Sequence, residues 1–169
     1  MVAKKVASLL QRQVNREFYS SYLYLEFANF YADRGLKGFE SWYRVQAKEE
    51  LDHAMMFVDY MHNNGISVEL ETIEKPDADL AENIDGVRMA LEHERFVTES
   101  INEIYVAAKE ENDFRTCQFL DWFIAEQGEE EDNAMELLTQ IEMFGKDPKS
   151  LYLLDKDTGN RKYVAPSQE

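Results

Sequence analysis

Glu50 and His53 stand three residues apart in the stretch Glu-Glu-Leu-Asp-His at positions 49–53. On an α-helix this spacing places a carboxylate and an imidazole on one face, where they can supply an oxygen and a nitrogen ligand to one metal ion. Such a pair also occurs by chance on solvated helix faces, so it is weak evidence alone. Here it lies within a row spaced four and three residues apart, which is typical of the inward face of a bundle helix. That row contains Phe39, Tyr43, Gln46, Glu50, His53, Phe57 and Tyr60.

The apolar periodicity predicts four long helices. They cover residues 3–33, residues 36–63, a stretch that begins between Asp79 and Ile84 and ends near Glu111, and residues 113–144. Each has polar side chains near the middle of its inward row: Glu17 in the first, Glu50 and His53 in the second, Glu94 in the third, Gln127 and Glu130 in the fourth. Because the midpoints of helices of similar length share one layer, these side chains should converge at half height in the core. Four crowded carboxylates would repel and take up protons. A pair of divalent metal ions bridged by Glu50, as in di-iron carboxylate bundles, removes that repulsion.

The connections predict an all-α fold, an up-down-down-up four-helix bundle. Gly35 and Gly65 end the first two helices. A long extended crossover over residues 65–80 lets the third helix lie parallel to the second. Asp79 with Glu82 forms a capping-box pattern ahead of the third helix. A short fifth helix is expected around residues 151–154, which divides the chain into a bundle (1–145) and a C-terminal helix and tail (146–169).

Composition narrows the class of protein. The chain carries 18 basic and 34 acidic residues, a net charge of -16, which repels nucleic acid and attracts cations. A single cysteine, Cys117, rules out an intrachain disulfide and a Cys-rich metal site. The N-terminus lacks the apolar core of a signal peptide, and no charge-free run approaches the ~18 residues that cross a bilayer. The expected location is the cytoplasm, with no membrane partner.

The ligand set is asymmetric. The fourth helix offers Glu126-Gln127-Gly128-Glu129-Glu130, with no second Glu-x-x-His. One metal position would therefore have the His53 nitrogen and the other only oxygens, a donor set that suits iron or manganese better than a structural zinc. The oxygen-only position is predicted to be the weaker one. His93 points about 100° away from Glu94 around its helix, so it is expected on the surface or behind the ligands.

At these residues the chain resembles the ferritins, and most closely the haem-free bacterial ones. The motifs are Asn-Arg-Glu-Phe-Tyr-Ser-Ser at 15–21, Glu49-Glu50-x-x-His53, His93-Glu94 and Trp122-x-x-x-Glu126-Gln127-x-Glu129-Glu130. The resemblance implies a first iron on Glu17, Glu50 and His53; a second on Glu50, Glu94 and Glu130, with Gln127 beside it; a third, adjacent iron on Glu49, Glu126 and Glu129; and Tyr24 as a candidate electron donor. It also implies a hollow homo-oligomeric shell of roughly 24 subunits.

Two related groups are set aside. Bacterioferritins have the second Glu-x-x-His and a haem-ligating Met, where this chain has Asp52, so no haem is expected. Rubrerythrins add a Cys-x-x-Cys domain, which a single cysteine excludes.

Three functions follow as hypotheses. The first is a ferroxidase with storage, in which Fe(II) is oxidised by O2 or H2O2 and Fe(III) is kept as hydrated oxide inside the shell. The second is a passive container whose carboxylates only nucleate mineral. The third is a non-storage di-iron or di-manganese enzyme, such as an oxygenase or a catalase. The intact ligand set favours the first hypothesis over the second, and the missing second Glu-x-x-His disfavours the third.

Overall fold

The computed structural model describes residues 2–166; Met1 and the last three residues of the predicted tail, 167–169, lie outside the described residues. Five helices follow one another: α1 (Lys4–Asp33), α2 (Lys37–Asn63), α3 (Asp85–Glu110), α4 (Phe114–Phe144) and α5 (Pro148–Thr158). The predicted all-α class, the four long helices and the short fifth helix are confirmed.

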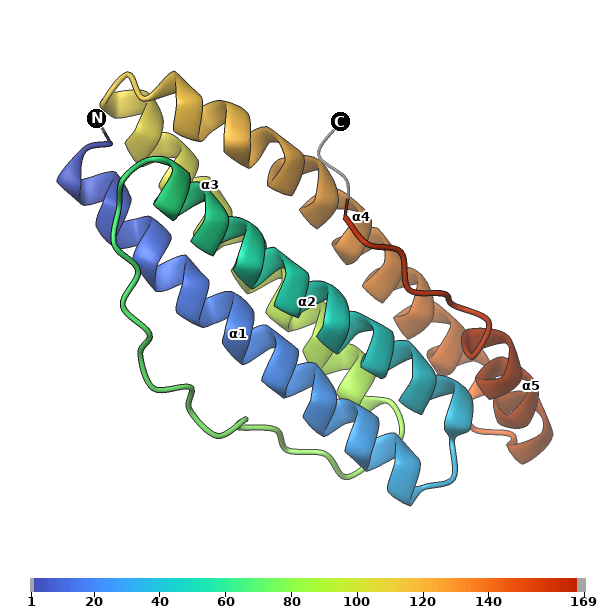
Figure 1. Cartoon of the computed structure of the whole chain (residues 1–169). Coiled ribbons are helices and arrows are strands. Elements are labelled where there is room, and N and C mark those ends of the chain that lie inside the picture. Colours follow the sequence, from blue (N-terminus) through green and yellow to red (C-terminus); the bar gives the residue numbers. More distant parts are fainter. Residues whose placement is uncertain (1, 167–169) are drawn as a thin grey trace.

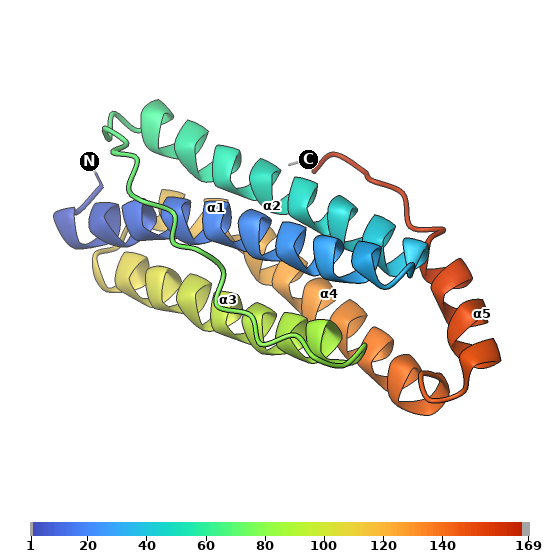
Figure 2. The same ribbon diagram turned by 90° about the horizontal axis from the view of Figure 1, so that it is seen from below.

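The predicted order of helix directions is also confirmed. Figure 1 shows α1 and α2 running antiparallel, the connection after α2 returning along the whole bundle, and α3 and α4 forming a second antiparallel pair. In Figure 2 the same connection crosses α1 before it reaches the start of α3. Hydrogen bonds fasten it to α1: the Glu69 N–H donates to Gln11 Oε1 at 3.0 Å, and Asn15 Nδ2 donates to the Thr72 carbonyl at 3.1 Å. A connection of this length allows α3 to lie parallel to α2.

Local chemistry explains where the helices end. Gly35 and Gly65 adopt φ values of +73° and +70°, a left-handed backbone that glycine enters without steric cost. The Asp113 side chain accepts from the Thr116 N–H at 3.1 Å and so caps α4.

The predicted capping box at the start of α3 is wrong. This helix begins later, at Asp85, and its N-cap residue makes no side-chain hydrogen bond. The Asp85 carboxylate accepts instead from the N–H groups of Ala81 and Glu82, at 3.0 and 2.6 Å. The Glu82 N–H is therefore used within the turn that precedes the helix, and the chain enters α3 only after that turn.

The core consists of two apolar clusters with a polar layer between them. One cluster packs around Leu10, Phe57 and Phe123, and the other around Phe27 and Tyr43. Each fully buried side chain of this size stabilises the fold by about 1.5–3 kcal/mol relative to an exposed one. Between the clusters lie the buried polar residues Glu17, Glu50, His53, Glu94, Gln127 and Glu130. The fold thus places costly polar groups at half height, supported from both ends by apolar packing.

The fifth helix is joined closely to the start of α2. The backbone N–H groups of Gly38 and Phe39 donate to Asp155 Oδ1 at 2.8 and 3.0 Å. A Cβ atom at position 38 would lie 1.5 Å from the Asp155 carbonyl oxygen, so this approach requires glycine. Over residues 2–166, no helix is both long enough and apolar enough to cross a membrane.

Candidate metal centre

The polar layer contains a compact group of three side chains: Glu17 from α1, and Glu50 and His53 from α2. One ligand atom from each residue lies within 4.8 Å of the others. The three residues are only 1%, 2% and 2% exposed. Gln13 Nε2 donates to Glu17 Oε1 at 2.7 Å, whereas Glu17 Oε2 is buried without a hydrogen-bond partner. An unpartnered buried carboxylate oxygen is costly, and Glu17 lies beside a carboxylate and an imidazole that could share a cation with it.

The predicted residues of α3 and α4 reach the same layer through hydrogen bonds. The Tyr24 O–H donates to Glu94 Oε1, and Gln127 Nε2 donates to Glu94 Oε2 at 3.1 Å. Glu130 Oε2 accepts from Gln46 Nε2 at 2.8 Å, and the same nitrogen donates to Glu50 Oε1 at 3.1 Å. Gln46 therefore links carboxylates of α2 and α4. Within residues 2–166, only Glu17, Glu50 and His53 come close enough to form a group of three metal-binding side chains.

Burial and crowding control protonation in the layer. Burial and the neighbouring Glu50 raise the pKa of Glu17 to about 8, and the same two causes raise that of Glu130 to about 7. They also raise the pKa of Glu94 well above its ordinary value. Burial disfavours the charged form of His53, but Glu50 beside it outweighs this and raises the imidazole pKa to about 10. In the metal-free layer, protons thus take the place of cations.

The residues that the resemblance assigns to a third iron lie at the edge of the layer. Glu49 and Glu126 are half-buried, and Glu129 is exposed. Glu49 forms an ion pair with Arg161 of the segment after α5. The structure therefore gives Glu49 a partner that the sequence did not predict.

Two side chains that matter to the layer were not among the predicted site residues. Gln46 belongs to the inward row of α2, so its burial could be predicted, but its link between two carboxylates could not. Arg161 donates to Gln46 Oε1 and comes from a segment with no periodic pattern.

His93 lies behind the ligands, one of the two places expected for it. It is half-buried, and its Nε2 is 2.7 Å from Ser20 Oγ. Burial lowers the pKa of this imidazole, so His93 is neutral near pH 7.

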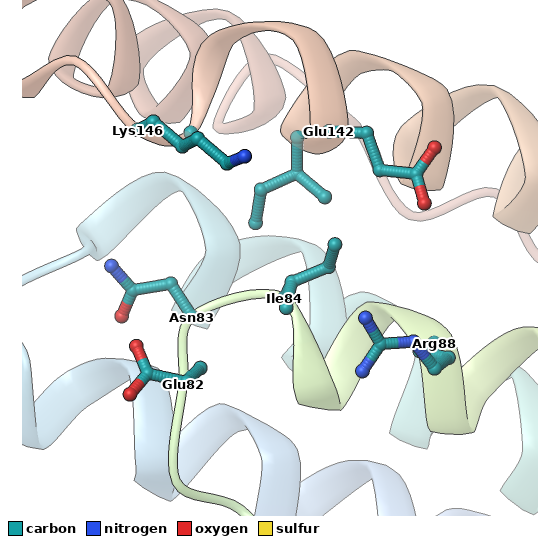
Figure 3. A pocket seen from close by; sticks show the side chains of 8 residues that line it. Glu82, Asn83, Ile84, Arg88, Glu142 and Lys146 are labelled. Atoms are coloured by element: carbon teal, nitrogen blue, oxygen red, sulfur yellow. The ribbon is translucent and has the colours of Figure 1, made fainter.

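The space around the layer is narrow. A gap of about 10 Å³ lies between Tyr24, Gln46, Glu94 and Glu130, which is room for about one water molecule. A wider cavity of about 540 Å³ lies between the start of α3 and the end of α4. Figure 3 shows charged side chains of both signs around it, among them Arg88, Glu142 and Lys146. The wide cavity shares no residue with the polar layer, and the gap within the layer has room for about one water molecule. The layer therefore suits ions and small oxidants rather than an organic substrate.

Known proteins share this fold and sequence. The family model described as "Ferritin-like domain" matches residues 7–144. A probable bacterial non-heme ferritin-like protein of Haemophilus influenzae is 34% identical over 95% of this chain and 97% of its own length. A bacterial non-heme ferritin of Campylobacter jejuni is 32% identical over 92% and 93%.

The solved structures agree. An open-pore ferritin from the archaeon Archaeoglobus fulgidus superimposes with a TM-score of 0.94 at 39% identity, covering 96% of this chain and 100% of that one. An engineered closed form of the same ferritin has a TM-score of 0.94 at 38% identity, covering 97% and 100%. The chain therefore belongs to the ferritin family, iron-storage proteins with a ferroxidase centre.

Proposed function

We propose that the polar layer binds a pair of Fe(II) ions as substrate for oxidation by O2 or H2O2, and that Fe(III) is then stored as hydrated oxide. The observation that carries this proposal is the buried, unpartnered Glu17 Oε2 beside Glu50 and His53. Carboxylate oxygens with one imidazole nitrogen are a donor set that suits iron. The donors present thus fit the ion that the family stores.

The two positions share Glu50 and otherwise use different residues. Glu17, Glu50 and His53 would hold the first iron. Glu50, Glu94 and Glu130 would hold the second, with Gln127 beside it, and this all-oxygen position is the weaker of the two. Bound iron supplies the electrons for the oxidant, and the protein holds two ions close together. Tyr24 donates to Glu94 within the layer, which suits a phenol that supplies a further electron.

The surrounding side chains prepare the ligands. Gln13 and Gln46 donate to Glu17, Glu50 and Glu130, which fixes where these carboxylates point before metal arrives. Binding of Fe(II) must displace protons, because carboxylates bind metal only when ionised. The raised pKa values of Glu17 and Glu130 place this exchange close to neutral pH.

Storage requires a container larger than one bundle. The family implies an oligomeric shell, which we extend to roughly 24 copies of this chain in the cytoplasm. Large apolar side chains left exposed on the single chain support contacts between copies. They include Leu70 in the crossover, 77% exposed, and Phe114 at the start of α4, 68% exposed. We assign residues 1–145 to the bundle and 146–169 to a separate C-terminal helix and tail.

Loss of either predicted ligand tests catalysis. Aerobic Fe(II) is added to metal-free protein while ferric absorbance is followed, with Glu50→Ala and His53→Ala as variants and the exposed His62→Ala on the same helix as control. We expect the two ligand variants to slow oxidation by at least about 10-fold and the control to match wild type.

A passive container would mineralise equally well with and without those ligands, and that result would reject catalysis. Negative-stain imaging of iron-loaded protein tests storage separately. Round particles with dense centres are expected, whereas a monomer without mineral would favour a non-storage di-iron enzyme.

A further inference from the structure

The segment after α5 is fastened to α2. Residues 160–166, called the tail below, turn back from α5 and run beside the bundle toward its middle (Figures 1 and 2). The Tyr163 O–H donates to Asp52 Oδ2 at 2.6 Å, and Lys48 Nζ lies 3.4 Å from the centre of the Tyr163 ring. The Arg161 guanidinium lies 4.4 Å from the centre of the Trp42 ring. All three partners belong to α2, so the tail follows this helix at two successive points of attachment.

Arg161 contacts two residues beside the metal centre. One guanidinium nitrogen donates to Gln46 Oε1 and the other to Glu49 Oε2. The side chains of Arg161 and Glu49 are each only 15% exposed, so this pair is shielded from solvent far more than an ordinary surface ion pair. Two charge-assisted hydrogen bonds from one planar group also fix its orientation.

Gln46 ties this contact to the centre itself. Its oxygen accepts from Arg161, while its nitrogen donates to Glu50 and Glu130. A reversed amide would direct its NH2 group at the guanidinium and its oxygen at two carboxylates, so the observed orientation is the only favourable one. Arg161 is therefore linked through one side chain, that of Gln46, to Glu50 and Glu130, two of the proposed iron ligands.

Glu49 is one of the carboxylates that the ferritin pattern assigns to a third iron, together with Glu126 and Glu129. Because the Arg161 guanidinium already contacts Glu49, the chain itself supplies there the positive charge that a third ion would bring.

We propose that Arg161 is a built-in cation that occupies the third metal position, so that the docked tail limits each subunit to the paired centre. This inference rests on the proposed function, because it assumes that the pair itself binds metal. A third ion could bind Glu49 only after Arg161 had left it, which would break the ion pair and both guanidinium hydrogen bonds. The tail therefore acts as a selectivity element that keeps incoming iron at the oxidation site.

The test counts bound Zn²⁺, which is not oxidised, on the metal-free assembled protein by calorimetry and equilibrium dialysis. Salt of about 0.15 M screens weak surface binding. Wild type should bind about two ions per subunit, one at the His53 position and a weaker one at the all-oxygen position, which is the number of a paired centre. Arg161→Gln, which removes the charge but keeps a hydrogen-bonding side chain, should bind about one more.

Three further variants sharpen the result. Adding Glu49→Gln to Arg161→Gln should abolish the extra ion, because its ligand is gone. Arg161→Lys keeps a cation within reach and should match wild type. Lys162→Ala removes an exposed neighbouring charge of the tail and should also match wild type.

The outcomes separate the two proposals. Equal Zn²⁺ counts in wild type and Arg161→Gln, or a third tight ion already present in wild type, would overturn the role of Arg161. An extra ion in Arg161→Lys would overturn the argument from charge. If wild type binds no Zn²⁺ at the paired centre and does not accelerate Fe(II) oxidation, the proposed function fails instead.

Discussion

Replacing Glu17 with glutamine should stabilise the metal-free protein while weakening its metal binding. Glu17 is 1% exposed, lies within 4.8 Å of Glu50 and His53, and has one oxygen without a hydrogen-bond partner. Glutamine has the same shape and no charge. Its oxygen can still accept from Gln13, and its NH2 group can donate toward Glu50, as a protonated Glu17 would. The substitution therefore retains the packing and removes only the need to ionise or hold a proton.

The magnitude follows from the pKa shift of Glu17. Its pKa rises from 4.5 to about 8 on folding. Because the folded pKa is the higher one, the contribution to stability is fully present below pH 4.5 and is lost as pH rises toward 8. With about 1.4 kcal/mol per pKa unit, this loss amounts to roughly 4 kcal/mol at pH 7.5 but under about 1 kcal/mol at pH 5. Glu17→Gln, which does not titrate, should avoid that loss.

Thermal unfolding of metal-free protein at both pH values measures the effect. The roughly 4 kcal/mol expected at pH 7.5 corresponds to a gain of about 8–16 °C in Tm for a chain of this size, and the effect at pH 5 corresponds to less than about 4 °C. Glu26→Gln, an exposed carboxylate change on the same helix, is the control and should leave Tm unchanged. With Zn²⁺ added, wild type should gain more than Glu17→Gln, which reverses the order. An equal gain at pH 5 and pH 7.5, or no gain at all, would refute the account of a crowded buried carboxyl.

Four other perturbations test separate parts of the structure. Tyr24→Phe removes a donor to Glu94 and should cost the Zn²⁺-loaded protein about 1.5–3 kcal/mol, the usual value for a hydrogen bond to a charged group. The cost should be smaller without metal, because burial raises the pKa of Glu94 and so favours its uncharged form. Thermal unfolding with and without Zn²⁺ checks both. Gly38→Ala places a Cβ 1.5 Å from the Asp155 carbonyl oxygen and should release α5, seen as faster proteolysis after residue 145. Gly128→Ala, with nothing within 4 Å of its Cβ, should be neutral or stabilising. Zn²⁺ binding near pH 7 should release protons, and fewer as pH rises through 8; calorimetry in buffers of different ionisation enthalpy counts them.

The parts of the fold that could be predicted are those controlled by local signals. Periodicity and the glycines at 35 and 65 placed the ends of the first two helices within about a residue. The capping box predicted from Asp79 and Glu82 is wrong because the Asp85 carboxylate accepts the N–H groups of the turn before α3. That contact follows from the fold of the turn and not from the spacing of Asp79 and Glu82.

The polar layer could be predicted because it interrupts four apolar rows at similar depth. The contacts that complete it could not. Arg161 and Glu49 are 112 residues apart in the chain, and nothing in the spacing of either predicts that they meet. The orientation of the Gln46 amide is likewise decided by three partners from separate segments, so it follows from the assembled structure alone.

The position of the layer explains how the bundle tolerates it. The two apolar clusters lie on opposite sides of the layer and contain most of the large buried side chains, so each half of the bundle packs without help from the carboxylates. Repulsion within the layer is therefore confined to a narrow slab, where protons relieve it until metal arrives. At the edge of that slab the chain supplies its own cation, Arg161, from the segment that follows α5. The chain thus places a permanent positive charge, Arg161, at the edge where metal binding should be restricted. It places exchangeable protons on the carboxylates of the layer, where metal must enter.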